Sequence, residues 1–210
     1  MAGIESFGAY IPIYRLSRGE IARAWGGKSA GGEKAVANCD EDSLTMGVEA
    51  AIDCLNGMNR QLVDGLYFAS TTPPYREKQS ASILAAAVDL RKNLFSMDIT
   101  NSLRGGTNAL RAALDAVNAG SAKKVLVVAS DQRVPAPNSE YEMYFGDGAA
   151  ALLVGESDVA INIEGSYSTS SEFIDIWRTE HDTYYRTWED RFILEEGYLK
   201  IVPATVSELM

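Results

Sequence analysis

The segment KKVLVVASD (residues 123–131) restricts the fold of this chain more than any other stretch of its sequence. An unbroken apolar run stands there between two lysines and an aspartate. Such a run is typical of a strand that is covered on both faces, as in parallel sheets, whereas a half-buried strand alternates apolar and polar residues. VDGLYFAST (63–71) also predicts a buried strand, and LFSMDIT (94–100) predicts a third. We therefore expect a sheet with parallel central strands and helices on both faces.

Helical segments precede and separate these strands. In SRGEIARAWGG, Ser17 is the expected N-cap and Glu20 completes a capping box, while Gly26 and Gly27 end the helix. Residues 28–38 are expected to form a loop with a short strand at its end. Further helices are expected at residues 40–57, 80–90 and 104–119.

The remaining strands complete a layered α/β domain. One is expected at residues 3–16, ending near Pro12. Two more, at 147–155 and 159–168, are expected to pair as a hairpin across Glu156–Asp158. Strand–helix alternation followed by paired strands indicates a mostly parallel sheet.

The chain is expected to divide near residue 168. Residues 1–168 carry the alternating elements, with a loop at 132–146, and form the α/β part. Residues 169–210 are richer in aromatic and charged side chains and are expected to form an irregular extension.

Composition excludes several classes of protein. Hydrophobic residues make up 46% and charged residues 23%, as in ordinary globular proteins, and the net charge of −10 argues against non-specific binding of nucleic acid. The N-terminus lacks the basic and apolar regions of a signal peptide, and no apolar run approaches the length that spans a bilayer. Cys39 and Cys54 have neither the spacing of metal ligands nor that of a disulfide framework. We expect a cytoplasmic protein with reduced thiols, no metal and no membrane contact.

A strand leads directly into a helix in DITNSLRGGTNALRAALDAV (98–117). Elbows of this kind often present a nucleophile at a helix N-terminus, where the dipole stabilises an anion. Here the tip carries Ser102, Leu103 and Arg104, and no cysteine. The glycines that follow, Gly105 and Gly106, fit either a close approach of another backbone at the site or tight packing of the helix.

Several motifs together resemble the hydroxymethylglutaryl-CoA synthase family in its archaeal and bacterial form, and specifically the N-terminal half of its thiolase fold. They occur in the order of that family over nearly the whole chain: GIESFGAYIPIYRLSRGEIARAWG, DEDSLTMGVEAA, TNSLRGGTNAL, VLVVASD, GDGAAALLVG, DIWRTE and GYLKIVPATVSELM. The resemblance implies one half of a thiolase-like α/β fold.

The resemblance also implies a reaction. In that family a cysteine at the elbow is acylated by an acyl-CoA, a glutamate acts as general acid and base, and a histidine and an asparagine of the second half complete an oxyanion site. Aligned by motif, the cysteine position is Leu103 and the glutamate position is Thr71. Neither side chain can do the family's chemistry, so the catalytic competence of this chain is in doubt.

Other side chains are candidates for the missing nucleophile and the missing base. Ser102 is a nucleophile only if a base lies beside it, and His181 is about eighty positions away, so a turn or capping role is favoured. Cys54 is expected in the core, Cys39 is not expected to be activated, and His181 is expected at a surface or interface. The substrate-binding candidates on the elbow are Arg104, Gly105, Gly106 and Thr107, and a further candidate, Tyr75, lies in the loop after the strand at 63–71. Arg104 is equally suited to an exposed helix start.

Three hypotheses for function remain open. The first is an enzyme that forms or breaks carbon–carbon bonds on an acyl-CoA without an acyl-cysteine. Some relatives of the thiolase fold carry out retro-aldol cleavage with tyrosines and water, for which Tyr75, Tyr141 and Tyr144 are candidates. A coenzyme A thioester is then a ligand, and no other cofactor is expected.

The second hypothesis is a non-catalytic subunit. It would pair with an active thiolase-fold paralogue or with an OB-fold/zinc-ribbon acyl-CoA-binding protein.

The third hypothesis concerns the length of the chain. Half of a thiolase fold would expose the apolar face on which the other half docks. We therefore expect a homo- or hetero-oligomer and not a monomer.

Overall fold

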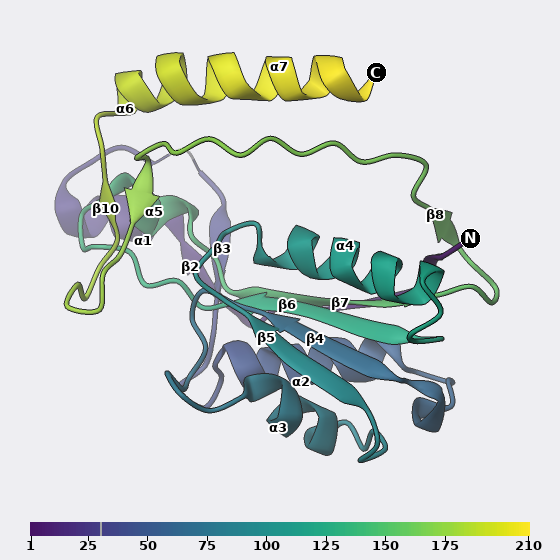
Figure 1. Cartoon of the computed structure of the whole chain (residues 1–210). Helices are drawn as coiled ribbons and strands as arrows, with labels where there is room; N and C mark the ends of the chain where they lie inside the picture. The colour runs from purple at the N-terminus through teal and green to yellow at the C-terminus, as the bar shows by residue number, and fades with distance from the viewer. Residues whose placement is uncertain (30) are drawn as a thin grey trace. The chain divides into compact units, whose positions relative to one another are not determined.

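A six-stranded sheet forms the centre of the larger of two compact units in the computed structural model, which describes residues 1–29 and 31–210 (Figure 1). The larger unit comprises Met1–Arg133 and Met143–Asn162, and the smaller unit comprises Val134–Glu142 and Ile163–Met210. Residue 30, which falls in the loop expected at 28–38, lies outside the described residues.

The larger unit contains the strands and helices predicted between residues 63 and 131. Its strands are β1 (Gly3–Tyr10), β2 (Tyr14–Ser17), β3 (Glu33–Val36), β4 (Gly65–Ala69), β5 (Phe95–Ile99), β6 (Val125–Asp131), β7 (Gly148–Gly155) and β8 (Ile161–Asn162). Its helices are α1 (Arg18–Trp25), α2 (Ser43–Cys54), a 3-10 helix (Arg60–Leu62), α3 (Ser80–Ala87) and α4 (Gly105–Asn118). A short helix, α5 (Glu140–Tyr144), crosses from the smaller unit into the larger one.

The sheet is mixed, with the strand order β5-β4-β6-β7-β1-β8. β4 pairs in parallel with β5 and β6, while the pairs β6–β7, β7–β1 and β1–β8 are antiparallel. Since β7 is antiparallel to both of its neighbours, β5, β4, β6 and β1 run in one direction. The expectation of an α/β sheet with mostly parallel strands is confirmed.

Helices cover both faces of the sheet, as predicted. α2 and α3 lie on one face and α4 lies on the other (Figure 1). The apolar core lies between the sheet and the helices α2 and α3, and its largest fully buried side chains are Phe68, Met46, Leu55, Leu66, Leu84 and Leu126. Among the described residues, none of the helices has the length and apolar character that crossing a bilayer requires.

The predicted hairpin between residues 147–155 and 159–168 is wrong. β1 lies between the two segments and pairs with β7 along Gly3–Tyr10. Because β1 occupies that edge of β7, the later segment has only the outer edge of β1 to pair with. There it forms a two-residue strand, β8, opposite Gly3 and Ile4.

The predicted capping box of α1 is also wrong. Ser17 is the expected N-cap and accepts a hydrogen bond from Gly19 N at 3.1 Å. The carboxylate of Glu20, however, pairs with Arg23 on the next turn, while the backbone of Ser17 belongs to the β2–β3 ladder. The helix ends at Gly26 as predicted, in a left-handed conformation with φ of 69°.

A reciprocal capping box is instead present at α2. Asp42 accepts from Thr45 N at 2.8 Å, and the Thr45 hydroxyl accepts from Asp42 N at 2.7 Å. The helix therefore begins at Ser43, three residues after the expected start at residue 40.

The smaller unit is more regular at its end than the sequence suggested. β9 (Ile176–Trp177) pairs with β10 (Arg186–Thr187). Then α6 (Asp190–Phe192), a π-helix (Ile193–Tyr198) and α7 (Leu199–Leu209) follow without a break. Gly197 and Pro203 lie inside this helical segment, and because both residues usually interrupt helices, the sequence did not predict it. At Gly197 a Cβ would lie 2.7 Å from Phe173 Cε1, so the glycine permits this packing.

Replacing Gly8 by alanine is expected to destabilise the larger unit. A Cβ at this position of β1 would lie 2.5 Å from Ala50 O and 2.9 Å from Asp53 C of α2, so the helix must move off the sheet. We expect the free energy of unfolding, measured in urea, to fall by about 2–3 kcal/mol. Gly27→Ala is the control, because nothing lies within 4 Å of its added Cβ. Equal stability of the two variants would contradict this account of the β1–α2 contact.

Candidate active site

The elbow between β5 and α4 is a tight turn built by its own side chains. Asn101 has a positive φ of 63°. Ser102 Oγ accepts a hydrogen bond from Arg104 N at 3.1 Å, and Ser102 O accepts one from Gly105 N at 2.9 Å. The hydroxyl of Thr107 donates to Arg104 O at 3.0 Å. Ser102 therefore acts as a turn residue, and within the part of the chain that the structure describes its hydroxyl bonds to the backbone N–H of Arg104 and to no base.

The two glycines allow α4 to pack closely on the sheet. A Cβ on Gly106 would lie 3.2 Å from Ala129 Cβ, and one on Gly105 would lie 3.4 Å from Ile99 O. Neither glycine has a positive φ. Their role here is the tight packing of the first turn of α4, so that the N-terminus of the helix lies directly over the ends of β4 and β6.

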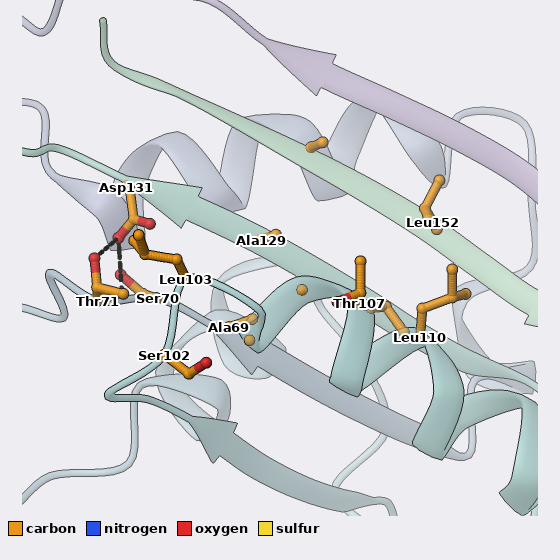
Figure 2. Close-up of a pocket in the computed structure, with 14 residues that line it drawn as sticks. Ala69, Ser70, Thr71, Ser102, Leu103, Thr107, Leu110, Ala129, Asp131 and Leu152 are labelled. Atoms are coloured by element: carbon orange, nitrogen blue, oxygen red, sulfur yellow. Dashed lines mark hydrogen bonds between the residues drawn. The ribbon is translucent and has the colours of Figure 1, made fainter. Parts of the chain in front are cut away.

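A cavity of about 310 Å³ opens beside this turn (Figure 2). It lies between α4 and the carboxyl-terminal half of β4, β6 and the adjoining part of β7. It is lined by Ala69, Ser70, Thr71, Ser102, Leu103, Gly105, Gly106, Thr107, Leu110, Val127, Ala129, Asp131, Ala150 and Leu152.

Most of the predicted site residues meet at this cavity. Leu103, at the cysteine position of the family pattern, is 57% exposed there, and Thr71, at the glutamate position, lines the same space. Ser102 and Thr107 line it too, as do both glycines. Arg104 is exposed at the N-cap of α4 and is not among the lining residues.

The tyrosines make other contacts. Tyr75 lies under Lys78, with the ammonium 5.4 Å from the ring centre, and Tyr144 lies under the guanidinium of Arg18 at 5.7 Å. Neither ring lines the cavity. Tyr141 belongs to the smaller unit, where its hydroxyl donates to Thr187 Oγ1 at 3.4 Å.

Asp131, the last residue of β6, is a cavity residue to which the sequence analysis assigned no role. Its Oδ1 accepts four hydrogen bonds from the loop after β4: from Thr71 N at 2.7 Å, Thr71 Oγ1 at 3.0 Å, Thr72 Oγ1 at 3.0 Å and Ser70 Oγ at 3.1 Å. Figure 2 shows Asp131 beside Thr71 and Ser70, with dashed lines marking hydrogen bonds between them. The available signal was the position of this carboxylate at the carboxyl end of a buried parallel strand.

Polar and apolar groups lie at different ends of the cavity. One end carries hydroxyl groups and Asp131, which is the only ionisable side chain among the lining residues. At the other end the walls are aliphatic, with Val127, Leu152 and Leu110. The N-terminus of α4, a helix of fourteen residues, contributes to the lining and favours negative charge beside it.

Among the described residues that line the cavity there is no cysteine and no histidine. Cys54 is fully buried as the last residue of α2, and burial raises the pKa of its thiol to about 11. Cys39 and His181 are exposed, and His181 belongs to the smaller unit. Within residues 1–29 and 31–210, no group of three or more His, Cys, Asp and Glu side chains is placed to hold a metal ion.

The chain is similar to hydroxymethylglutaryl-CoA synthases over its whole length. It is 35% identical over 213 residues to that of Thermococcus sibiricus and 34% identical over 222 residues to that of Methanocaldococcus jannaschii. These alignments cover 99% and 100% of this chain but 61% and 63% of the relatives, so the chain spans about three fifths of their length. Residues 97–172 match the family of 3-oxoacyl-[acyl-carrier-protein (ACP)] synthase III.

Solved structures agree with the fold. A structure of HMG-CoA synthase complexed with CoA superposes with a TM-score of 0.87 at 21% identity, over 99% of this chain and 55% of that one. MvaS in complex with 3-hydroxy-3-methylglutaryl coenzyme A gives 0.84 at 25% identity, over 92% of this chain and 49% of the other. The expectation of a thiolase-like α/β fold is confirmed.

The two cysteines are expected to differ in reactivity. Burial disfavours the thiolate of Cys54, and with a pKa of about 11 this thiol stays protonated at pH 8, whereas Cys39 is exposed. We expect a disulfide reagent at pH 8 to label one thiol per native chain and two after unfolding in urea. The Cys39→Ser variant is the control and should show no fast labelling. Fast labelling of that variant would place Cys54 at the surface.

Proposed function

Because the chain belongs to the hydroxymethylglutaryl-CoA synthase family, we propose that it binds a coenzyme A thioester at the cavity beside α4 and acts on it without an acyl-cysteine. The reaction class is formation or cleavage of a carbon–carbon bond next to the thioester carbonyl. The observation that carries this proposal is Leu103, which lines the cavity at the N-terminus of α4 where the family pattern has its cysteine.

Three features support thioester binding. The cavity has a polar end and aliphatic walls, which suit a thioester carbonyl and an acyl chain respectively. The N-terminus of α4 favours the negative charge that develops on a thioester oxygen. Relatives of similar fold have been crystallised with CoA and with 3-hydroxy-3-methylglutaryl coenzyme A.

The side chains at the two family positions limit the chemistry. Leu103 has no nucleophile, and the Thr71 hydroxyl donates to Asp131 and is no carboxylate base. Acylation of the elbow is therefore excluded from the proposal. Tyr75 and Tyr144 lie outside the lining of the cavity, so the tyrosine-based cleavage gains no support from them.

Calorimetry with acetyl-CoA and acetoacetyl-CoA tests whether the chain binds a thioester. The Leu103→Cys variant tests whether position 103 lies where a thiol can be acylated. We expect wild-type chain to bind both thioesters and to form no acyl-enzyme. A thiol at position 103 stands at a helix N-terminus, where the dipole favours the thiolate, so Leu103→Cys should gain one acetyl group by mass spectrometry. Leu103→Ser is the matched control and should gain none. Absence of binding to both thioesters by the wild type would refute the proposed ligand.

A non-catalytic subunit is the second candidate, and the sheet provides specific support for it. β5 is an edge strand in the described sheet, and the outward N–H groups of such a strand can pair with another chain, while the outward carbonyl of Ser96 accepts from Gln79 Nε2 at 2.8 Å. On the α4 side of the sheet, Phe7 of β1 is 67% exposed beside its cross-strand neighbour Leu152. An open edge and an exposed apolar face favour a partner, either a second thiolase-fold subunit or an OB-fold/zinc-ribbon protein.

Ser96→Pro is expected to prevent association through β5. The N–H of Phe95 donates to Asp64 O inside the sheet at 2.9 Å, so the backbone groups of the next residue, Ser96, point away from β4. Proline there removes an outward donor and leaves the pairing with β4 intact. Sedimentation should show an oligomer for the wild type and a monomer with an unchanged circular dichroism spectrum for the variant. A monomeric wild type at micromolar concentration would contradict this pairing.

A further inference from the structure

We propose that Asp131 is the proton-transfer group of the cavity, and that its carboxylate removes and returns a proton at the α-carbon of a bound acyl-CoA. The inference rests on the proposed function, because it requires a thioester in the cavity. It assigns the acid–base role to a strand-end aspartate in place of the glutamate that the family pattern has at position 71.

The first argument is location. Asp131 Oδ1 lies 3.0 Å from Thr71 Oγ1 and 2.7 Å from Thr71 N. A carboxylate is thus present within one hydrogen bond of the residue that replaces the family's glutamate. Asp131 is also the only ionisable side chain that lines the cavity, so no other residue of the lining can take up a proton as a carboxylate, imidazole or amine would.

The second argument is the asymmetry of the carboxylate. The three hydroxyl groups and one amide that bond to Asp131 all donate to Oδ1, and Oδ2 accepts none of these bonds. Thr72 Oγ1 also accepts from Gln132 N at 2.9 Å, and Ser70 Oγ accepts from Thr72 N at 3.0 Å, so the donors are themselves held in place. A group fixed through one oxygen presents the other in a defined direction, which proton transfer requires.

The third argument is the environment of the reacting carbon. The same cavity is lined by Leu103, Gly106 and Thr107 around the first turn of α4. The first N–H groups of a helix have no partners within it, and the dipole there favours an anion. A thioester whose carbonyl oxygen faces this turn would form an enolate with its charge at the helix N-terminus.

The step is balanced without another reactant. Asp131 Oδ2 takes a proton from the α-carbon, the C–H bond breaks, and its electron pair forms the enolate of the thioester. The proton stays on the carboxyl group and returns to the α-carbon in the reverse direction. The enolate is the common intermediate for making and for breaking the neighbouring carbon–carbon bond, so the role of Asp131 is the same in both directions.

Exchange of the methyl hydrogens of acetyl-CoA in D₂O tests this role without knowledge of the natural acyl group. The full chain is used together with any subunit that copurifies, and loss of the methyl signal is followed by NMR. We expect the wild type to catalyse exchange and Asp131→Asn to be at least about 100-fold slower, which is the usual contribution of a general base. Asp115→Asn is the control, since this exposed carboxylate on α4 pairs with Arg111 and is not among the lining residues of the cavity, so the variant should exchange at the wild-type rate.

Binding and exchange together separate the possible failures. Calorimetry with acetyl-CoA should give similar affinity for wild type and Asp131→Asn, and absence of binding to the wild type refutes the proposed function itself. Exchange by Asp131→Asn within tenfold of the wild type overturns the role of Asp131. Binding of acetyl-CoA by the wild type without exchange overturns it too, even if Asp131→Asn fails to fold.

Discussion

The parallel pairing of β4 with β6 is the constraint on which the candidate site depends. Ala69 pairs with Ala129, so the chains that leave the two strands run side by side and Thr71 meets Asp131 two residues later. The hydrogen bonds between them join the loop after β4 to the end of β6. The first turn of α4 packs over the same strand ends. The helix thus forms one wall of the cavity, and the sheet forms the opposite wall. A change of register between β4 and β6 would separate all of these groups.

The sequence predicts this part of the fold well because its signals are local. Residues 63–131 carry unbroken apolar runs for buried strands and clear helical segments between them, and all of these elements are present. The predictions fail where pairing is decided at long range. Nothing in the residues around Glu156–Asp158 shows that β1 occupies the edge of β7, so the two later segments appeared to be neighbours. The helix from residue 190 was missed because its glycine and proline suggest an interruption that tertiary packing overrides.

The site was predictable in part for a related reason. Motif order placed Leu103 and Thr71 at the family positions, and both line the cavity. Asp131 was overlooked because a motif shows which expected residue is absent and does not show which neighbouring residue supplies a similar group. Its importance follows from the register of two strands and from the hydroxyl groups of the loop after β4. Those are properties of the folded chain.

The position of β1 between β7 and β8 also determines when the sheet can form. β1 comprises Gly3–Tyr10, and its two neighbours are β7 and β8, which end at Asn162. During synthesis on the ribosome, the first strand therefore emerges far ahead of both of its partners. Contacts between such distant segments form slowly, because the entropy of closing the loop is lost before pairing compensates for it. β1 therefore has no partner strand until most of the larger unit has been translated.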